Sequence, residues 1–220
     1  MKTKRIECVE GLSLSINNQE IGVISHYSGG KNILVFSPDY LALPAKKRNT
    51  FTMSQLVNEQ ALGKPVISSQ RLPPVLSNLL PEGALRHWMA QSLKVHEDNE
   101  FPLMAHMGRS LPGGLIASPI IAGQLPVWAL DHREQVEAIQ IDVATQQNKF
   151  SLAGVQMKFS SVRNKDGRFN IGTDANDDSW IIKTPSTVHQ FVPFNEFSAM
   201  RLAEAAGVDI PEIKLVELSN

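Results

Sequence analysis

The chain has 220 residues, of which 42% are hydrophobic and 20% charged. This length suits one large domain or two small ones, and the composition excludes a disordered chain. With 21 basic and 22 acidic side chains, the formal net charge of −1 excludes a global basic field that would attract nucleic acid, so such a contact would need a local patch or a partner.

The single cysteine, Cys8, cannot form an intramolecular disulfide, which indicates a reducing compartment. The first ten residues carry Lys2, Lys4 and Arg5, but no apolar segment of the signal-peptide type follows them. No apolar run approaches the roughly 20 residues of a membrane-spanning helix. We therefore expect a cytoplasmic protein with no membrane segment.

The first 70 residues carry the patterns of short strands. Alternating apolar and polar residues predict strands over residues 12–16 and 21–25, and an apolar run predicts another over 32–36. Asn17-Asn18 and Gly29-Gly30 predict the turns between them. Short strands joined by tight turns favour a small antiparallel sheet or barrel.

Helical patterns follow. Pro73 and Pro74 suit the first turn of a helix, and leucines then recur at helical spacing at positions 76, 79 and 80. A second helix is predicted over residues 84–95, where the apolar side chains form one stripe. Both stripes are interpreted as core packing.

The middle of the chain is less regular. Residues 107–114, with one proline and three glycines, predict a loop, and residues 115–127 predict short strands. Residues 131–144 are interpreted as one helix and a linker. We therefore predict two domains, residues 1–145 and residues 146–220.

The last block begins with a small-residue turn and an antiparallel sheet. Strands are predicted over residues 155–161, 168–172 and 180–183, with a hairpin turn at Asp166-Gly167. The third strand ends in Lys183. The overall prediction is an α+β fold.

A helix over residues 195–206 and a strand over residues 213–216 complete the predicted elements. Asn195 suits the start of the helix and Gly207 its end. Ala199, Leu202, Ala203 and Ala206 recur at helical spacing, so we expect this alanine-rich face to pack closely.

The parts of this block suit phosphoryl transfer from a nucleotide. A loop of small residues lets backbone N–H groups approach phosphate oxygens. A strand lysine, here Lys183, offers a positive charge to the phosphates, and a helix glutamate, here Glu196, holds that lysine in place. Two alternatives remain open: Lys183 as a solvated edge charge, and Glu196 as a partner of the helix dipole.

Four segments of the chain match motifs of one known family. Residues 75–83 read Val-Leu-Ser-Asn-Leu-Leu-Pro-Glu-Gly, and residues 150–158 read Phe-Ser-Leu-Ala-Gly-Val-Gln-Met-Lys. Together with residues 180–185 and 195–208, they resemble the N-terminal half of HipA-family serine/threonine kinases, the toxins of bacterial HipBA toxin–antitoxin pairs. In that order the four segments are similar to a helix motif of the family, its phosphate-binding loop, its strand with the ATP lysine and the following helix.

The resemblance implies a set of nucleotide-binding residues. They are Ser151, Ala153, Gly154, Val155, Gln156, Lys158, Lys183 and Glu196. The cofactors would be ATP and Mg²⁺. Ser151 matches the serine that family kinases autophosphorylate, although a turn hydroxyl is an equal alternative. A phosphoserine in an ATP-binding loop would repel the nucleotide.

The remaining family features concern the N-terminal domain and the catalytic residues. By resemblance the N-terminal domain packs on the kinase lobe and contributes to antitoxin contact. Ser110 stands where a family loop usually has Asp. The catalytic Asp, the Asn and the metal-binding Asp of the family follow the helix of Glu196, whereas Asp209 is the only Asp after Lys183 here. We therefore predict no catalytic residue, a truncated kinase and only weak ATP binding by this chain alone.

Two functions compete. The chain is either the N-terminal half of a HipA-like kinase or a non-enzymatic regulator of the antitoxin type. Its partner would be a HipB-like antitoxin or a separate kinase lobe, and DNA would be reached only through the antitoxin. A small nucleotide-binding module is a third reading. The six histidines and one cysteine show no paired ligand spacing, so no metal site is expected.

Overall fold

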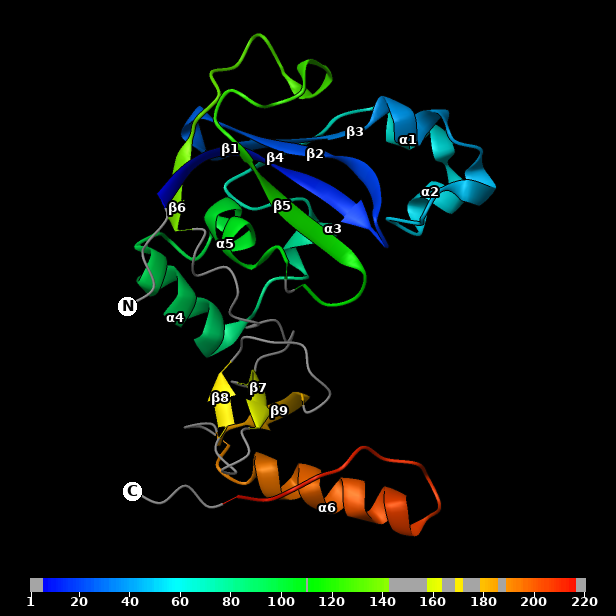
Figure 1. Cartoon of the computed structure of the whole chain (residues 1–220), viewed down its shortest axis with the longest axis vertical. Coiled ribbons are helices and arrows are strands. Elements are labelled where there is room, and N and C mark those ends of the chain that lie inside the picture. Colours follow the sequence, from blue (N-terminus) through cyan, green and yellow to red (C-terminus); the bar gives the residue numbers. More distant parts are fainter. Residues whose placement is uncertain are drawn as a thin grey trace.

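The computed structural model describes residues 6–109, 111–142, 158–163, 169–171, 179–185 and 189–216. They form an antiparallel sheet of six strands with helices on one side, and a separate sheet of three strands followed by one long helix (Figure 1). The predicted α+β class is confirmed. Sheet order in the larger sheet is β4-β3-β2-β1-β5, with β6 also paired to β1.

The predicted strands of the first block are confirmed and extended. They lie within β1 (Ile6–Ile16), β2 (Gln19–Tyr27) and β3 (Lys31–Phe36). Asn17 and Asn18 both have positive φ, as a two-residue hairpin loop between twisted strands requires. Strand β4 (Val66–Ser69) forms one edge of the sheet.

An excursion of short helices separates β3 from β4. It contains α1 (Pro38–Ala42), the 3₁₀ turn Ala45–Lys47, α2 (Ser54–Val57) and a second 3₁₀ turn, Glu59–Gly63. Arg48 fastens this excursion by donating to the backbone carbonyls of Leu41 and Leu43 and by pairing with Glu59. These contacts give the excursion a defined structure at one end of the sheet.

Three helices cover one face of the sheet. Helix α3 (Pro74–Ser77) is a single turn, shorter than the leucine spacing suggested, and α4 (Gly83–Leu93) agrees with the predicted second helix. Helix α5 (Glu100–Met107) was not predicted. Seven of its eight residues are buried, so it has no polar face and shows no amphipathic period.

Strand β5 (Leu115–Ile121) agrees with the predicted strand, but the helix predicted over residues 131–144 is wrong for the described part. There, residues 132–134 form a turn and a bend, Val136 forms an isolated bridge with Tyr27, and Ile139–Asp142 form strand β6. Ile139 and Ile141 alternate with polar residues, and β6 pairs with the first four residues of β1, from Ile6 to Val9. Period-two alternation and an available strand edge decide against a helix.

The smaller sheet has the order β8-β7-β9. Its strands are β7 (Lys158–Arg163), β8 (Phe169–Ile171) and β9 (Ser179–Lys183), which confirms the described parts of the three predicted strands. Residues 155–157, 168 and 172 of those predictions lie outside the described residues. Helix α6 (Val192–Ala205) follows. The strand predicted over residues 213–216 is wrong: these residues have no regular structure, and Leu215 and Val216 are exposed.

The packing face predicted for α6 is also wrong. Three of its four residues, Ala199, Leu202 and Ala206, are exposed, with Leu202 71% accessible. Only Ala203 of that face is half-buried, as are Phe197 and Met200. The larger side chains of the neighbouring face bury more apolar area than alanines do, and they decide which side of the helix turns inward. No residue of α6 is fully buried.

Candidate functional site

The candidate site is built on the last residue of strand β9 and the second turn of helix α6. There the Lys183 ammonium group donates to Oε1 of Glu196 in an ion pair. The two side chains remain 32% and 38% exposed. The pair therefore joins strand and helix while leaving the ammonium group open to a further partner, since lysine has three donor hydrogens.

The start of α6 sets this geometry. The helix begins at Val192, three residues before the predicted start, with Pro193 in its first turn, where a missing N–H group leaves no hydrogen bond unmade. Glu196 is consequently the fifth helical residue rather than the second. Its carboxylate can reach back to the end of β9 across the short connection.

The register of the small sheet brings a second predicted residue close. Lys158, the first residue of β7, lies directly opposite Lys183 in the antiparallel β7–β9 pair. The predicted phosphate loop comes directly before Lys158 in the sequence. Five predicted residues of that loop lie outside the described residues, namely Ser151, Ala153, Gly154, Val155 and Gln156.

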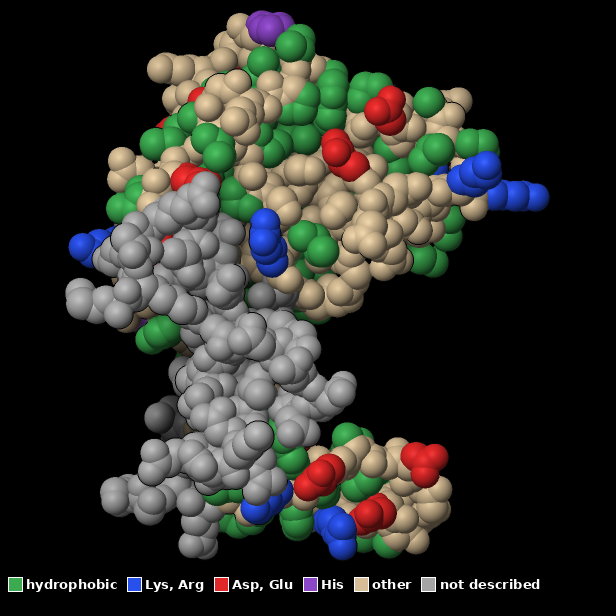
Figure 2. All heavy atoms as spheres, in the orientation of Figure 1, with side chains coloured by type: hydrophobic (Ala, Val, Ile, Leu, Met, Phe, Trp, Pro, Cys, Tyr) green, Lys and Arg blue, Asp and Glu red, His purple; other side chains and the backbone are tan. Residues whose placement is uncertain are grey.

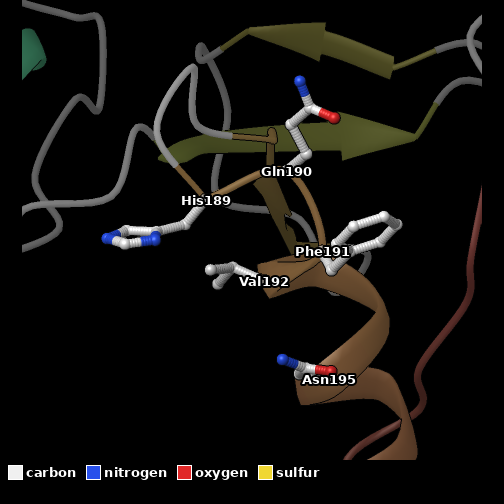
Figure 3. Close-up of a pocket in the computed structure, with 5 residues that line it drawn as sticks. All are labelled: His189, Gln190, Phe191, Val192 and Asn195. Atoms are coloured by element: carbon white, nitrogen blue, oxygen red, sulfur yellow. The ribbon is translucent and has the colours of Figure 1, made fainter.

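An open hollow of about 390 Å³ lies at the start of α6, and the sequence did not suggest it. Its described lining is His189, Gln190, Phe191, Val192 and Asn195. Figure 3 shows the side chains of His189, Val192 and Asn195 on one side of the first turn, with Phe191 directed to the other side. Neither Lys183 nor Glu196 is part of this lining, so we do not assign the nucleotide to the hollow.

The helical motif of residues 75–83 has a buried carboxylate beside it. Glu100, at the start of α5, is completely buried and accepts hydrogen bonds from the Leu72 N–H (2.7 Å), the Ser77 hydroxyl (2.7 Å) and the Arg86 guanidinium (2.5 Å). Arg86 also donates to the carbonyl of Glu97. Ser77 is the motif residue that takes part, which gives this motif a structural role.

The loop after α5 begins with a close backbone approach. Gly108 accepts from the Ala117 N–H at 2.7 Å, and a Cβ atom at residue 108 would lie 1.9 Å from the Ala117 carbonyl oxygen. Only glycine fits this contact between the end of α5 and strand β5. Ser110, for which the resemblance led us to expect Asp, lies outside the described residues.

In the described part of the chain, the surface charges and the possible metal ligands do not indicate a second site. Figure 2 shows acidic and basic side chains of both signs scattered over the visible face. Within the described ranges, no group of three or more His, Cys, Asp or Glu side chains is placed to hold a metal ion. No helix among those ranges combines the length and apolarity needed to cross a membrane.

Family comparison matches both halves of the chain. Residues 12–118 match the family described as HipA N-terminal domain, and residues 150–220 match the family described as HipA-like C-terminal domain. The second match contains the small sheet, Lys183 and helix α6. The first contains most of the larger sheet and helices α3 to α5.

Individual relatives agree with this assignment. The chain is 32% identical to “Putative kinase Y4dM” of Sinorhizobium fredii over 213 residues, covering 94% of this chain and 49% of the relative. It is 29% identical to “Serine/threonine-protein kinase toxin HipA” of Shewanella oneidensis over 163 residues, covering 70% of this chain and 36% of the relative. The chain thus spans half or less of the length of these curated relatives.

Proposed function

Because this chain belongs to the HipA family, we propose that residues 146–220 act as the nucleotide-binding small lobe of a serine/threonine protein kinase of the toxin–antitoxin type. Residues 1–145 would be the domain that packs on the kinase and contacts its antitoxin. The observation that carries the proposal is the ion pair between Lys183 at the end of β9 and Glu196 on α6.

Lys183 would bind the phosphates of ATP, and Glu196 would hold the ammonium group in the orientation that this contact needs. The remaining exposure of the Lys183 side chain, 32%, fits a group that still has room for an anion. Ser151, Ala153, Gly154, Val155, Gln156 and Lys158 would line the phosphates. Bound ATP with Mg²⁺ would supply the transferable phosphoryl group.

We expect the 220-residue polypeptide, tested by itself, to bind ATP weakly and to transfer no phosphate. Kinase chemistry needs one Asp that accepts the substrate proton and another that binds the metal. Asp209 is the only Asp after Lys183 in the sequence, and one carboxylate cannot fill both roles.

The test is a titration of the ¹⁵N-labelled chain with ATP and Mg²⁺, followed by amide chemical shifts. Shift changes are expected around Lys183 and Glu196, with an affinity in the millimolar range. Lys183→Met should abolish them. Lys214→Met, which removes an exposed lysine outside the site, should leave them unchanged.

Three results would count against the proposal. Absence of shift changes near Lys183 at saturating ATP would remove the nucleotide site. Equal binding by the Lys183→Met variant would place the nucleotide elsewhere. Submicromolar ATP binding, or transfer of labelled phosphate to Ser151 by the isolated chain, would contradict the expectation of an incomplete site.

A second candidate function is a non-enzymatic regulator that docks on a kinase lobe or on a HipB-like antitoxin, reaching DNA only through that antitoxin. The observation in its favour is the uncovered side of α6, where Phe194 and Leu202 are exposed. Calorimetry with a purified HipB-like antitoxin, and separately with an isolated kinase lobe, distinguishes the two functions. Tight binding together with no ATP contact at Lys183 would favour the regulator.

A further inference from the structure

His26 lies at a junction of three parts of the N-terminal domain. It belongs to β2, is 2% exposed, and its ring stacks on Phe101 of α5 with a centroid distance of 4.3 Å and an interplanar angle of 10°. Its Nδ1 atom is 2.8 Å from Oδ1 of Asn32 on β3. Its backbone carbonyl accepts from the N–H of Glu137, in the segment that leads to β6.

The hydrogen bonds of Asn32 indicate which ring nitrogen of His26 carries the proton. The Asn32 side-chain amide donates from Nδ2 to the carbonyl of Gly30 at 3.2 Å, so its oxygen faces His26. An oxygen there can only accept, and the neutral His26 ring therefore carries its proton on Nδ1. A second proton must go to Nε2, which would make the buried ring a cation.

The segment of residues 129–137 is held on β2 and β3 by polar contacts. The Ser25 hydroxyl donates to the carbonyl of Ala129, and the Tyr27 hydroxyl accepts from the N–H of Asp131 at 2.8 Å. The Ser28 N–H donates to the carbonyl of Gln135 at 2.9 Å. Lys31 pairs with Glu134 at 2.6 Å. Segments held by polar contacts with little apolar burial open before the core does.

We propose that His26 is an acid-sensitive latch for the segment of residues 129–137. Protonation of the ring requires water to reach Nε2, and residues 26–28, at the end of β2 and the start of the turn after it, bind residues 135–137. Hydrating the ring therefore separates β2 from α5 and from this segment together. Acidification releases the segment while the centre of the sheet stays closed.

The charges around His26 support the proposal that the segment opens on acidification. Burial lowers the pKa of His26 from its ordinary value of 6.5, against the opposing effects of the Asn32 hydrogen bond and the Glu137 carboxylate. Asn32 on β3 and Phe101 on α5 carry no charge. Among the described residues, Glu137 is the charged group that acts on the His26 ring. The closed form thus binds the proton less well than the open form. Its stability is complete above pH 6.5 and falls as the pH drops from 6.5 toward the lowered pKa.

Amide hydrogen exchange of the full chain tests the latch. The reporting amides are Ser28, Asp131 and Glu137, with Ile24 and Leu34 as references at the centre of the sheet. Between about pH 7.5 and about pH 5.5, opening at the reporting amides, corrected for intrinsic exchange, should rise by up to about tenfold for one linked proton. Opening at the reference amides should rise less.

Two variants separate the latch from general acid sensitivity. His26→Asn keeps a donor for Asn32 but cannot titrate, so the rise should disappear. His106→Asn is the matched control, because burial also lowers the pKa of His106 on α5. It should keep the rise. A rise that survives in His26→Asn, or that disappears in His106→Asn, would overturn the proposal.

A measurement on the unchanged chain covers the case in which His26→Asn does not fold. Ring ¹⁵N shifts should show the Nδ1–H tautomer at neutral pH and a pKa below 6.5 for His26. A ring that titrates at or above 6.5, or that carries its proton on Nε2, would refute the latch.

Discussion

Arg86 and Glu100 form an ion pair in which the carboxylate is completely buried and the guanidinium side chain is 15% exposed. The same carboxylate accepts hydrogen bonds from the Leu72 N–H, in the linker before α3, and from the Ser77 hydroxyl on α3. It therefore connects this linker with helices α3, α4 and α5. A buried charge of this kind is tolerated only when its hydrogen bonds are complete. The pair therefore sets how the three helices sit together beneath the sheet.

Glu100→Ala should destabilise the N-terminal domain by about 3–5 kcal/mol, because it leaves Arg86 buried without its counter-charge. Glu100→Gln should lower the free energy of unfolding by about 1–3 kcal/mol, since an amide keeps part of the hydrogen bonding. Urea denaturation followed by circular dichroism measures both. The control is Asp98→Ala, which breaks the exposed pair with Arg71 and should change little. Equal losses from Glu100→Ala and Asp98→Ala would contradict the role given to the buried pair.

Gly108→Ala should destabilise the same domain by about 1–3 kcal/mol, because the new methyl group meets the Ala117 carbonyl and α5 must move away from β5. Gly63→Ala is the matched control, since nothing lies within 4 Å of a Cβ atom there. Thermal melts of the two variants compare them directly. A Gly108→Ala melt that matches the control would show that this backbone contact is looser than described.

The two sides of α6 should respond differently to truncation. Met200→Ala removes half-buried apolar area and should lower the stability of the C-terminal domain by on the order of 1 kcal/mol. Leu202→Ala removes an exposed side chain and should stay within about 0.5 kcal/mol of the unchanged chain. Denaturant curves for the two variants provide the comparison. If Leu202→Ala proves the more damaging, the exposed side of α6 is covered in solution, for example by a second copy.

Phosphorylation of Ser151 should oppose nucleotide binding if the proposed loop is correct. Ser151→Asp places a negative charge where the phosphates of ATP would lie, so the shift changes near Lys183 should need more ATP than in Ser151→Ala. The amide-shift titration with ATP and Mg²⁺ measures the difference. Indistinguishable titrations of the two variants would separate Ser151 from the nucleotide.

Local patterns predicted the strands well. Alternation and Asn or Gly turns located β1, β2 and β3. A strand lysine followed by a helix glutamate suggested the pairing of Lys183 with Glu196, which the structure brings together. The nucleotide role of that pair remains a prediction. Hydrophobic periodicity and turn residues depend only on neighbouring positions, so a single sequence is enough to read them.

Elements defined by distant contacts were missed. Helix α5 is buried on every side and so lacks an amphipathic period, and its Glu100 gave no signal because Arg86 and Ser77 come from other helices. Strand β6 forms because β1 offers it an edge more than 100 residues earlier. The inward side of α6 depends on what lies against it, which spacing of alanines alone does not decide.

Strand β1 pairs with two strands that come much later in the sequence, with β5 between Val9 and Ile16 and with β6 from Ile6 to Val9. The pairing of Ile6–Val9 with Ile139–Asp142 connects residues at least 130 positions apart. During synthesis this sheet cannot close until residue 142 has left the ribosome, so the first strand waits with an unpaired edge. In that interval the unpaired edge of β1 is open to pairing with strands of other chains.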